Sequence, residues 1–385
     1  MLRSLYSGIS GLRSHQTMLD VTGNNIANVN TAGFKGSSVE FQDTLSQLVR
    51  NSALPQADTG GSNPAQVGLG VQVAAITTNF AQGAAQSTGV PTHLMIAGDG
   101  FFVARSGGEA SYTRNGAFSF DAQGRMVTAD GAFVQGWTAQ NGEIIPGAAI
   151  GDITLPVGAI SPAAATTSAR VTGNLPSDAA VGDTLLRDIT VYDAEGDAST
   201  LTLEFTRTAG GWDVASGTAT SSLAFTDGEL TAGGTLTVGP ITIDLSSVTG
   251  YAELSTLKID GQDGHPAGTL QSYALSEDGS LIGTFSNGAT EVLARVALAT
   301  FVNPGGLEKV GSSRYVPTVN SGAAQVGMAG AEGMGSLISG ALEMSNVDLS
   351  QEFTNLIVAQ RGFQANARII TTSDEVLQEL TNLKR

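Results

Sequence analysis

Apolar side chains recur at helical spacing toward the C-terminus. Alternate steps of four and three residues from Leu349 meet an apolar side chain at seven of ten positions. Residues 346–385 are therefore predicted to form a helix with a narrow coiled-coil stripe. Ser345 is a candidate N-cap, and Asp348 favours the positive end of the helix dipole. The stripe positions expected to carry assembly are Phe353, Leu356, Phe363, Ile370 and Leu377.

The same stepping from Leu5 predicts a second helix, from Leu2 to Ile26 or Asn28, with stripe positions Leu5, Ile9, Leu12 and Leu19. A narrow stripe needs a partner surface, because one helix cannot bury it alone. The economical solution is that the two ends of the chain pack on each other, with everything between them as an excursion. The alternative, that each helix packs separately on a globular domain, is not excluded by periodicity.

An asparagine-rich segment follows the first helix. Asparagine tolerates left-handed backbone and competes with helical hydrogen bonds, and glycines complete the break. The apolar residues in this segment would be wasted in a solvated turn, so we expect a packed corner. Its predicted assembly residues are Asn24, Asn25, Asn28, Gly33 and Phe34.

Residues 31–75 are interpreted as a connector. Val39, Phe41, Leu45 and Leu48 have weak helical spacing, which predicts a helical segment over 37–50. Residues 51–70 contain prolines and glycines and predict an extended stretch. A long unstructured stretch is unusual inside a compact domain, so this one is either mobile or covered by a neighbouring molecule.

From Val71 the apolar period changes to two, and short strand-like runs alternate with turn dipeptides such as Asp99-Gly100 and Asn115-Gly116. We predict an α+β protein with mainly antiparallel β domains. An inner β domain is expected from two halves, 76–149 and 282–345. A block rich in Thr, Ser, Ala and Gly, residues 150–281, is expected as an inserted outer β domain. The terminal core is assigned to 1–30 and 346–385.

The net charge of −17 over 385 residues is confined to the middle of the chain. Residues 1–50 carry four basic and three acidic side chains, and residues 346–385 carry four and five. Nearly neutral terminal helices can crowd together, whereas acidic domains repel one another and suit a solvated exterior. Ordinary surface chemistry of an acidic domain is an equally good interpretation of charge alone.

No catalytic, metal or cofactor site is predicted. The chain has no cysteine, and its three histidines are far apart in the sequence. Residues 193–197 (DAEGD) resemble half of a calcium loop but lack the closing glutamate, so a hairpin turn is expected. No basic patch with interleaved aromatic residues predicts nucleic-acid binding, and no apolar run predicts a membrane span or a signal peptide.

Several motifs, in order, resemble the rod and hook family of bacterial flagellar axial proteins. The segment DVTGNNIANVNTAGFK (residues 20–35) is similar to the N-terminal signature of that family. SNVDLS (345–350) and QRGFQANA (360–367) resemble its C-terminal signature. GDGFFV (98–103), YTRNGAF (112–118) and FSNG (285–288) resemble its shared β domain. The block 150–281 matches no motif.

Within the family, the large insertion favours the hook branch, while the long connector keeps a distal rod protein or another hook-basal body protein as the alternative. A secreted β-rich adhesin or carbohydrate-binding protein is the alternative from a different class. The resemblance implies a helical homopolymer that forms a flexible curved tube, the universal joint that transmits torque.

The implied partners are the chain itself, the distal rod protein, the hook cap, the hook-filament junction protein and the flagellar export apparatus. The resemblance also implies an extracellular location reached without a cleaved signal peptide. Because Gln16, Gly23, Gln360 and Asp374 interrupt the stripes, the terminal helices are expected to complete their burial against neighbouring subunits. In the free monomer we expect them to be largely disordered.

Overall fold

The computed structural model describes residues 2–52, 54, 60–139, 142–145, 147–156, 158, 160–331 and 333–382. The chain divides into two compact units. Unit 1 comprises residues 1–155, 274–281 and 292–385, and unit 2 comprises 156–273 and 282–291. Each has its own fold and core.

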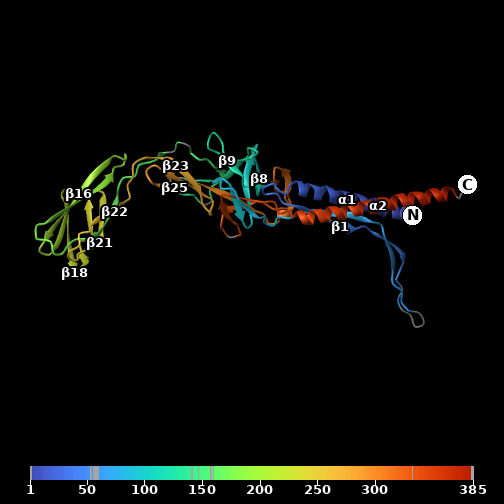
Figure 1. Cartoon of the computed structure of the whole chain (residues 1–385), viewed down its shortest axis with the longest axis horizontal. Helices are drawn as coiled ribbons and strands as arrows, with labels where there is room; N and C mark the ends of the chain where they lie inside the picture. The colour runs from blue at the N-terminus through green and yellow to red at the C-terminus, as the bar shows by residue number, and fades with distance from the viewer. Residues whose placement is uncertain are drawn as a thin grey trace. The chain divides into compact units, whose positions relative to one another are not determined.

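Two terminal helices and a long ribbon form one part of unit 1. Helix α1 spans Leu2–Ala27 and α2 spans Leu349–Asn382, and the two pack side by side (Figure 1). This confirms the predicted first helix and the pairing of the two ends. Helix α2 begins after Asp348, whose Oδ1 accepts hydrogen bonds from the backbone N–H groups of Ser350 and Gln351. Asp348, and not Ser345, is therefore the N-cap.

The segment after the corner is a two-stranded ribbon, so the predicted helix over 37–50 is wrong. Strand β1 (Ser37–Asp43) pairs with β4 (Val71–Thr78), and β2 (Ser46–Arg50) pairs with β3 (Ala65–Gly68), all antiparallel. Val39 and Phe41 fit the two-residue period of a strand as well as the helical period. Pairing with β4 supplies the backbone hydrogen bonds that make this segment a strand. The backbone N–H of Val71 donates to the Ser10 hydroxyl, which ties the ribbon to α1.

The β domain of unit 1 is built from short antiparallel strands. Short strands separated by turns follow one another there, as the apolar period of two and the turn dipeptides predict. The bounds are β5 (Ala85–Ser87), β6 (Leu94–Ala97), β7 (Phe101–Ser106), β8 (Glu109–Thr113), β9 (Phe118–Phe120), β10 (Met126–Thr128), β11 (Phe133–Thr138) and β12 (Gly151–Asp152).

The second half of the sheet begins with β23 (Gly268–Leu275), β24 (Ser280–Phe285) and β25 (Thr290–Thr300), of which residues 268–273 and 282–291 belong to unit 2. The remaining elements are η1 (Pro304–Gly306), β26 (Glu308–Gly311), β27 (Arg314–Val316), β28 (Gln325–Met328), β29 (Ser336–Ser339) and β30 (Ala341–Glu343). In the sheet the early strands β11, β7 and β8 lie side by side between late strands, since β25 pairs with β11 and β7 while β27 pairs with β8. Two further pairs, β6 with β29 and β5 with β30, join the two halves again.

An aromatic core holds the β domain of unit 1 together. Phe101, Tyr112, Phe301 and Tyr315 are buried, and three ring pairs among them meet edge to face at centroid distances of 4.8–5.9 Å. These residues come from β7, β8 and β27 and, in the case of Phe301, from the position directly after β25, so the core depends on both sequence halves.

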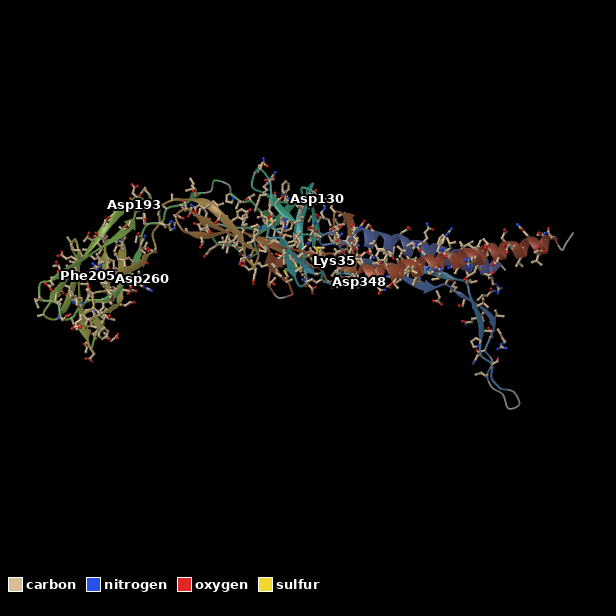
Figure 2. The ribbon with its side chains drawn as sticks, viewed as in Figure 1. Lys35, Asp130, Asp193, Phe205, Asp260 and Asp348 are labelled. Carbon is tan, nitrogen blue, oxygen red and sulfur yellow. The ribbon has the colours of Figure 1, made fainter. Side chains whose placement is uncertain are left out.

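Unit 2 contains two sheets over one apolar core. One sheet has the order β15 (Thr184–Tyr192), β16 (Ala198–Thr208), β17 (Gly211–Ser216), β18 (Ala219–Thr226) and β19 (Glu229–Ala232). The other has the order β20 (Thr235–Val238), β21 (Ile241–Thr249), β14 (Ser168–Asn174) and β22 (Lys258–Gln262), and β13 (Ile160–Ser161) pairs with β23. Phe205 and Trp212 are among the buried residues. Residues 193–197 form the predicted hairpin turn between β15 and β16. The backbone N–H of Asp197 donates to the side chain of Asp193, which is labelled in Figure 2.

Candidate functional site

Small residues bring α1 and α2 into close contact. A Cβ atom added at Gly11 would lie 2.8 Å from the side chain of Asn366, and one added at Gly362 would lie 2.5 Å from the ring of His15. Farther along, the Asn25 amide donates to Glu352 over 3.1 Å. The contacts advance along α1 as they retreat along α2, so the helices are antiparallel. Glycine at these positions permits an approach that any larger residue would prevent.

The buried contact between α1 and α2, which we call the seam, is shifted by one residue from several of the predicted stripe positions. The buried positions are small or polar, namely Gly8, Gly11, Ser14, Thr22, Asn25, Ala359 and Ser373. The predicted residues flank this seam and are half-buried: Leu5, Ile9, Leu12, Leu19, Leu356, Phe363, Ile370 and Leu377. Phe353 points away and is 52% exposed. Large apolar residues therefore border the intramolecular contact and do not fill it.

A second set of large apolar side chains on α2 is only half-buried. Their exposures range from 40% to 56%, and the set consists of Leu349, Phe353, Ile357, Val358, Ile369, Val376 and Leu380. Leu349, Phe353 and Ile357 follow a spacing of four residues, which keeps side chains on one side of a helix, and we call these three the outer face of α2. Ile369 lies toward α1 instead, because a Cβ atom added at Gly8 would be 3.5 Å from its side chain. An apolar surface of this extent on a helix indicates a missing partner.

The asparagine-rich corner is packed, as its apolar residues predict. Asn25 is buried, and its side chain both donates to the Ser37 carbonyl and accepts from the Ser37 N–H. Asn28 donates to the carbonyl of Asn24 and accepts from the Thr31 hydroxyl. These bonds replace the helical ones that end at α1.

Gly33 lets the corner meet the β domain. It has φ +67°, and an added Cβ would lie 2.5 Å from the backbone nitrogen of Asn115. Its N–H donates to the Glu343 carbonyl over 2.8 Å. Phe34 is half-buried, with the Lys309 ammonium 5.2 Å from its ring centroid. The corner is thus fixed to two strands from distant parts of the sequence.

A buried ionic cluster lies beside the corner, and sequence reasoning missed it. The Lys35 ammonium is 2.6 Å from one Glu343 oxygen, and the Arg114 guanidinium is 3.5 Å from the other. Figure 2 labels Lys35 between the helix pair and the β strands. Desolvation lowers the pKa of Lys35, and the hydrogen bond and charge of Glu343 oppose that shift. Desolvation likewise lowers the pKa of Arg114. The partners are too far apart in sequence for spacing to reveal them.

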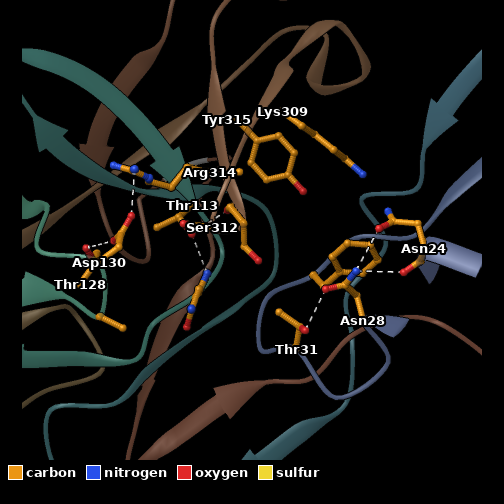
Figure 3. Close-up of a pocket in the computed structure, with 15 residues that line it drawn as sticks. Asn24, Asn28, Thr31, Thr113, Thr128, Asp130, Lys309, Ser312, Arg314 and Tyr315 are labelled. Carbon is orange, nitrogen blue, oxygen red and sulfur yellow. Dashed lines mark hydrogen bonds and ion pairs between the residues drawn. The ribbon is translucent and has the colours of Figure 1, made fainter. Parts of the chain in front are cut away.

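A cavity of about 490 Å³ opens between the corner and the β domain (Figure 3). Asn24, Asn28, Thr31 and Phe34 line it from the corner. The β-domain side includes Asp130, Lys309, Ser312, Ser313 and Arg314. No pattern along the chain predicted this cavity, because it forms only when the corner meets two separate hairpins.

The two ends of the chain form a helix pair with an exposed apolar surface, and the segment between them is an acidic β protein. This combination is typical of a structural subunit that assembles with further copies. Three family models match the chain. They are "Flagella basal body rod protein" over residues 5–35, "Flagellar hook protein FlgE/F/G D1 domain" over 95–173 and "Flagellar basal body rod FlgEFG protein C-terminal" over 338–383.

The chain belongs to the family of the flagellar hook protein FlgE, a family of structural hook subunits and not of enzymes. It is 39% identical to the flagellar hook protein FlgE of Borreliella burgdorferi, with 100% of both chains covered. It is also 35% identical to the flagellar basal-body rod protein FlgG of Bacillus subtilis, again with 100% of both covered.

The crystal structure of the Helicobacter pylori flagellar hook protein FlgE2 is similar in fold. The TM-score is 0.50 at 14% identity, and the match covers 67% of this chain and 100% of the other. Membership of this family places the chain in the bacterial flagellum. Among the helices in the described part of the chain, neither has a stretch long and apolar enough to cross a membrane.

Proposed function

We propose that this chain polymerises helically into the hook, a flexible curved tube that transmits torque as a universal joint. The observation that carries the proposal is the outer face of α2, because its apolar side chains remain 40–56% exposed while the seam between the two helices is already closed. In a polymer, the outer face would be buried against the terminal helices of neighbouring copies.

The energetics favour association through this face. Fully burying one large apolar side chain contributes about 1.5–3 kcal/mol, so burying the exposed half of several such side chains favours association and offsets part of the cost of ordering the helix. The small-residue seam contributes close packing but little apolar area. The helix pair would therefore be marginal in a free monomer and persistent in the polymer.

The division of labour along the chain follows from charge and packing. We assign the terminal core to residues 1–30 and 346–385, the connector to 31–75, the inner β domain to 76–149 and 282–345, and the outer domain to 150–281. Acidic outer domains that repel one another would make weak, reversible contacts, whereas the neutral core would stay connected. That combination allows a tube to bend without coming apart.

The proposed partners, besides further copies of the chain, are the distal rod protein at one end and the hook cap or the hook-filament junction protein at the other. The proposed route is passage through the flagellar export apparatus without a cleaved signal peptide, to an extracellular position on the basal body. A chain without cysteine, as this one is, cannot cross-link through disulfides on the way.

The test compares two double variants of α2. Phe353→Ser with Ile357→Ser removes two side chains of the outer face, and Thr354→Ser with Thr372→Ser changes two exposed polar residues on another side of the same helix. We expect the first to raise the critical concentration for polymerisation at least tenfold and the second to change it about twofold or less. Equal critical concentrations would contradict the proposed interface.

Electron microscopy of the unmodified protein separates the function classes. Curved tubes are expected of a hook subunit. Straight tubes would favour the alternative of a distal rod protein, which the similarity to the rod protein of Bacillus subtilis supports. Dispersed monomers at high concentration would favour a secreted adhesin. Deletion of residues 1–28 should abolish tubes; tubes formed without them would contradict a terminal-helix core.

A further inference from the structure

The cavity beside the corner contains more positive than negative charge. Among the described residues, the charged side chains that line it are Lys309, Arg314 and Asp130. Arg314 and Asp130 are paired at 2.9 Å, as the dashed line in Figure 3 shows. The cavity therefore has one positive charge in excess, in a chain whose net charge is −17.

Lys309 is the source of that excess. Its ammonium donates to the Lys35 carbonyl over 3.0 Å and to the Ser37 hydroxyl over 2.9 Å, and both acceptors are neutral. Desolvation lowers the pKa of Lys309. A partly desolvated ammonium that meets only neutral oxygens gains from an approaching carboxylate, since a charge-assisted hydrogen bond is about twice as strong as a neutral one.

Arg314 adds a second unmet donor. Its Nε atom is buried and has no hydrogen-bond acceptor among the described residues, although the guanidinium is paired with Asp130 through another nitrogen. A buried donor without an acceptor costs about 1–3 kcal/mol. The lining of the cavity thus favours a ligand that brings oxygen acceptors and negative charge.

The turn at the edge of the cavity is unusual for its residues. Ser312 and Ser313 connect β26 to β27 with φ of +50° and +55°, a region in which glycine is the ordinary choice. Ser313 also binds the domain, because its carbonyl accepts from the Thr113 hydroxyl. Ser312 is exposed and lines the cavity. The strained serines place a hydroxyl at the entrance where glycine would leave only backbone.

We propose that this cavity is a docking site for an acidic side chain, aspartate or glutamate, of a second copy of the chain. The inference rests on the proposed polymerisation, which brings copies together at high local concentration. The charge of the whole molecule supports this occupant, because 35 acidic side chains against 18 basic ones make every neighbouring copy a rich source of carboxylates. Lys309 and the Ser312 hydroxyl would contact the carboxylate.

The first experiment measures access to the cavity. Because the chain has no cysteine, Ser312→Cys introduces a single thiol at the entrance. We expect maleimide to label this thiol at least tenfold more slowly in polymers than in monomers of the same variant. Equal rates in polymers that form normally would overturn the docking site. Failure of the unmodified chain to polymerise would instead contradict the proposed function.

The second experiment tests the charge of the occupant. Lys309→Glu should raise the critical concentration at least tenfold, Lys309→Met should have an intermediate effect, and Lys309→Arg should assemble nearly as the unmodified chain does. Thermal unfolding of the β domain shows whether each variant is folded. If the Lys309→Glu variant does not fold, the comparison of Lys309→Met with Lys309→Arg still decides the question.

Two outcomes would overturn the proposal even if the introduced thiol is protected in polymers. Equal assembly of the Lys309→Met and Lys309→Arg variants would overturn a carboxylate occupant, because only the arginine keeps the positive charge. Protection of the thiol in monomers by inorganic phosphate alone would show a free-anion site and overturn docking by a second copy.

Discussion

The Nζ atom of Lys35 lies 2.6 Å from the Oε1 atom of Glu343, and both side chains are completely buried. This pair joins the corner after α1 to the strand before α2, across 308 positions of sequence. Lys35 also donates to the Ala81 carbonyl, and Glu343 accepts from the Gly83 N–H. A buried pair adds little net stability compared with an apolar pair, but it fixes one arrangement, because any other leaves a charge buried alone.

Replacing one member of this cluster should destabilise unit 1 strongly. Glu343→Ala leaves the ammonium of Lys35 and the guanidinium of Arg114 buried without their carboxylate, so we expect a loss of about 3–5 kcal/mol in the free energy of unfolding. Denaturant unfolding followed by circular dichroism measures it. The control is Asp152→Ala, which removes the partner of the more exposed Arg105 and should cost about 1 kcal/mol or less. Similar losses in the two variants would argue against a special role for the cluster.

The close approach of the helices gives a prediction with an internal control. Alanine normally stabilises a helix relative to glycine by about 1 kcal/mol. At Gly23 an added Cβ meets nothing within 4 Å, so Gly23→Ala should follow that rule. At Gly362 it would lie 2.5 Å from the His15 ring, which itself packs against Phe41. Gly362→Ala should therefore lower the melting temperature of the helical signal in polymers, and Gly23→Ala should not. A rise in both variants would mean that the helices are farther apart.

Unit 2 should lose stability in acid through one carboxylate. Desolvation opposes the shift, but hydrogen bonds from the backbone and hydroxyl groups of Thr167 and Ser168 outweigh it and lower the pKa of Asp263 from 3.8 to about 2. The folded form therefore prefers the carboxylate more than the unfolded chain does. Its contribution is present above pH 3.8 and is lost as pH falls toward 2.

The size of this effect is limited because Asp263 is exposed and solvent screens it, so about 1 kcal/mol or less is expected. The comparison is the unfolding of the unmodified chain and of Asp263→Asn at several pH values. The two curves should converge at low pH and separate above it. Parallel curves would show that Asp263 contributes no pH dependence.

Local patterns predicted the elements better than they predicted the contacts between them. The bounds of α1 and the strands of the β domain follow from spacing and turn dipeptides. The positions of the seam between α1 and α2 were not predicted. Where glycine lets two helix backbones come close, the large apolar residues of the stripe lie at the half-buried flanks of the contact. Gly8, Gly11 and Gly362 mark the close contact in the structure. In the sequence alone, however, a glycine within a helical pattern equally indicates a less stable helix. The ribbon after the corner was missed because its partner strand begins only at Val71.

Removal of residues 156–273, the larger part of unit 2, tests whether the middle of the chain has two independent cores. The buried cluster with Phe205 and Trp212 contains only residues between 169 and 257, whereas the aromatic cluster with Phe101 and Tyr315 contains none of them. Replacing residues 156–273 by a short Gly/Ser linker should therefore leave the aromatic core and its cooperative melting intact. Calorimetry should show two transitions in the whole chain and one in the deletion variant, at nearly the temperature it has in the whole chain. If the deletion abolished cooperative melting, the β domain of unit 1 would depend on unit 2 for its fold, and the two could not move independently.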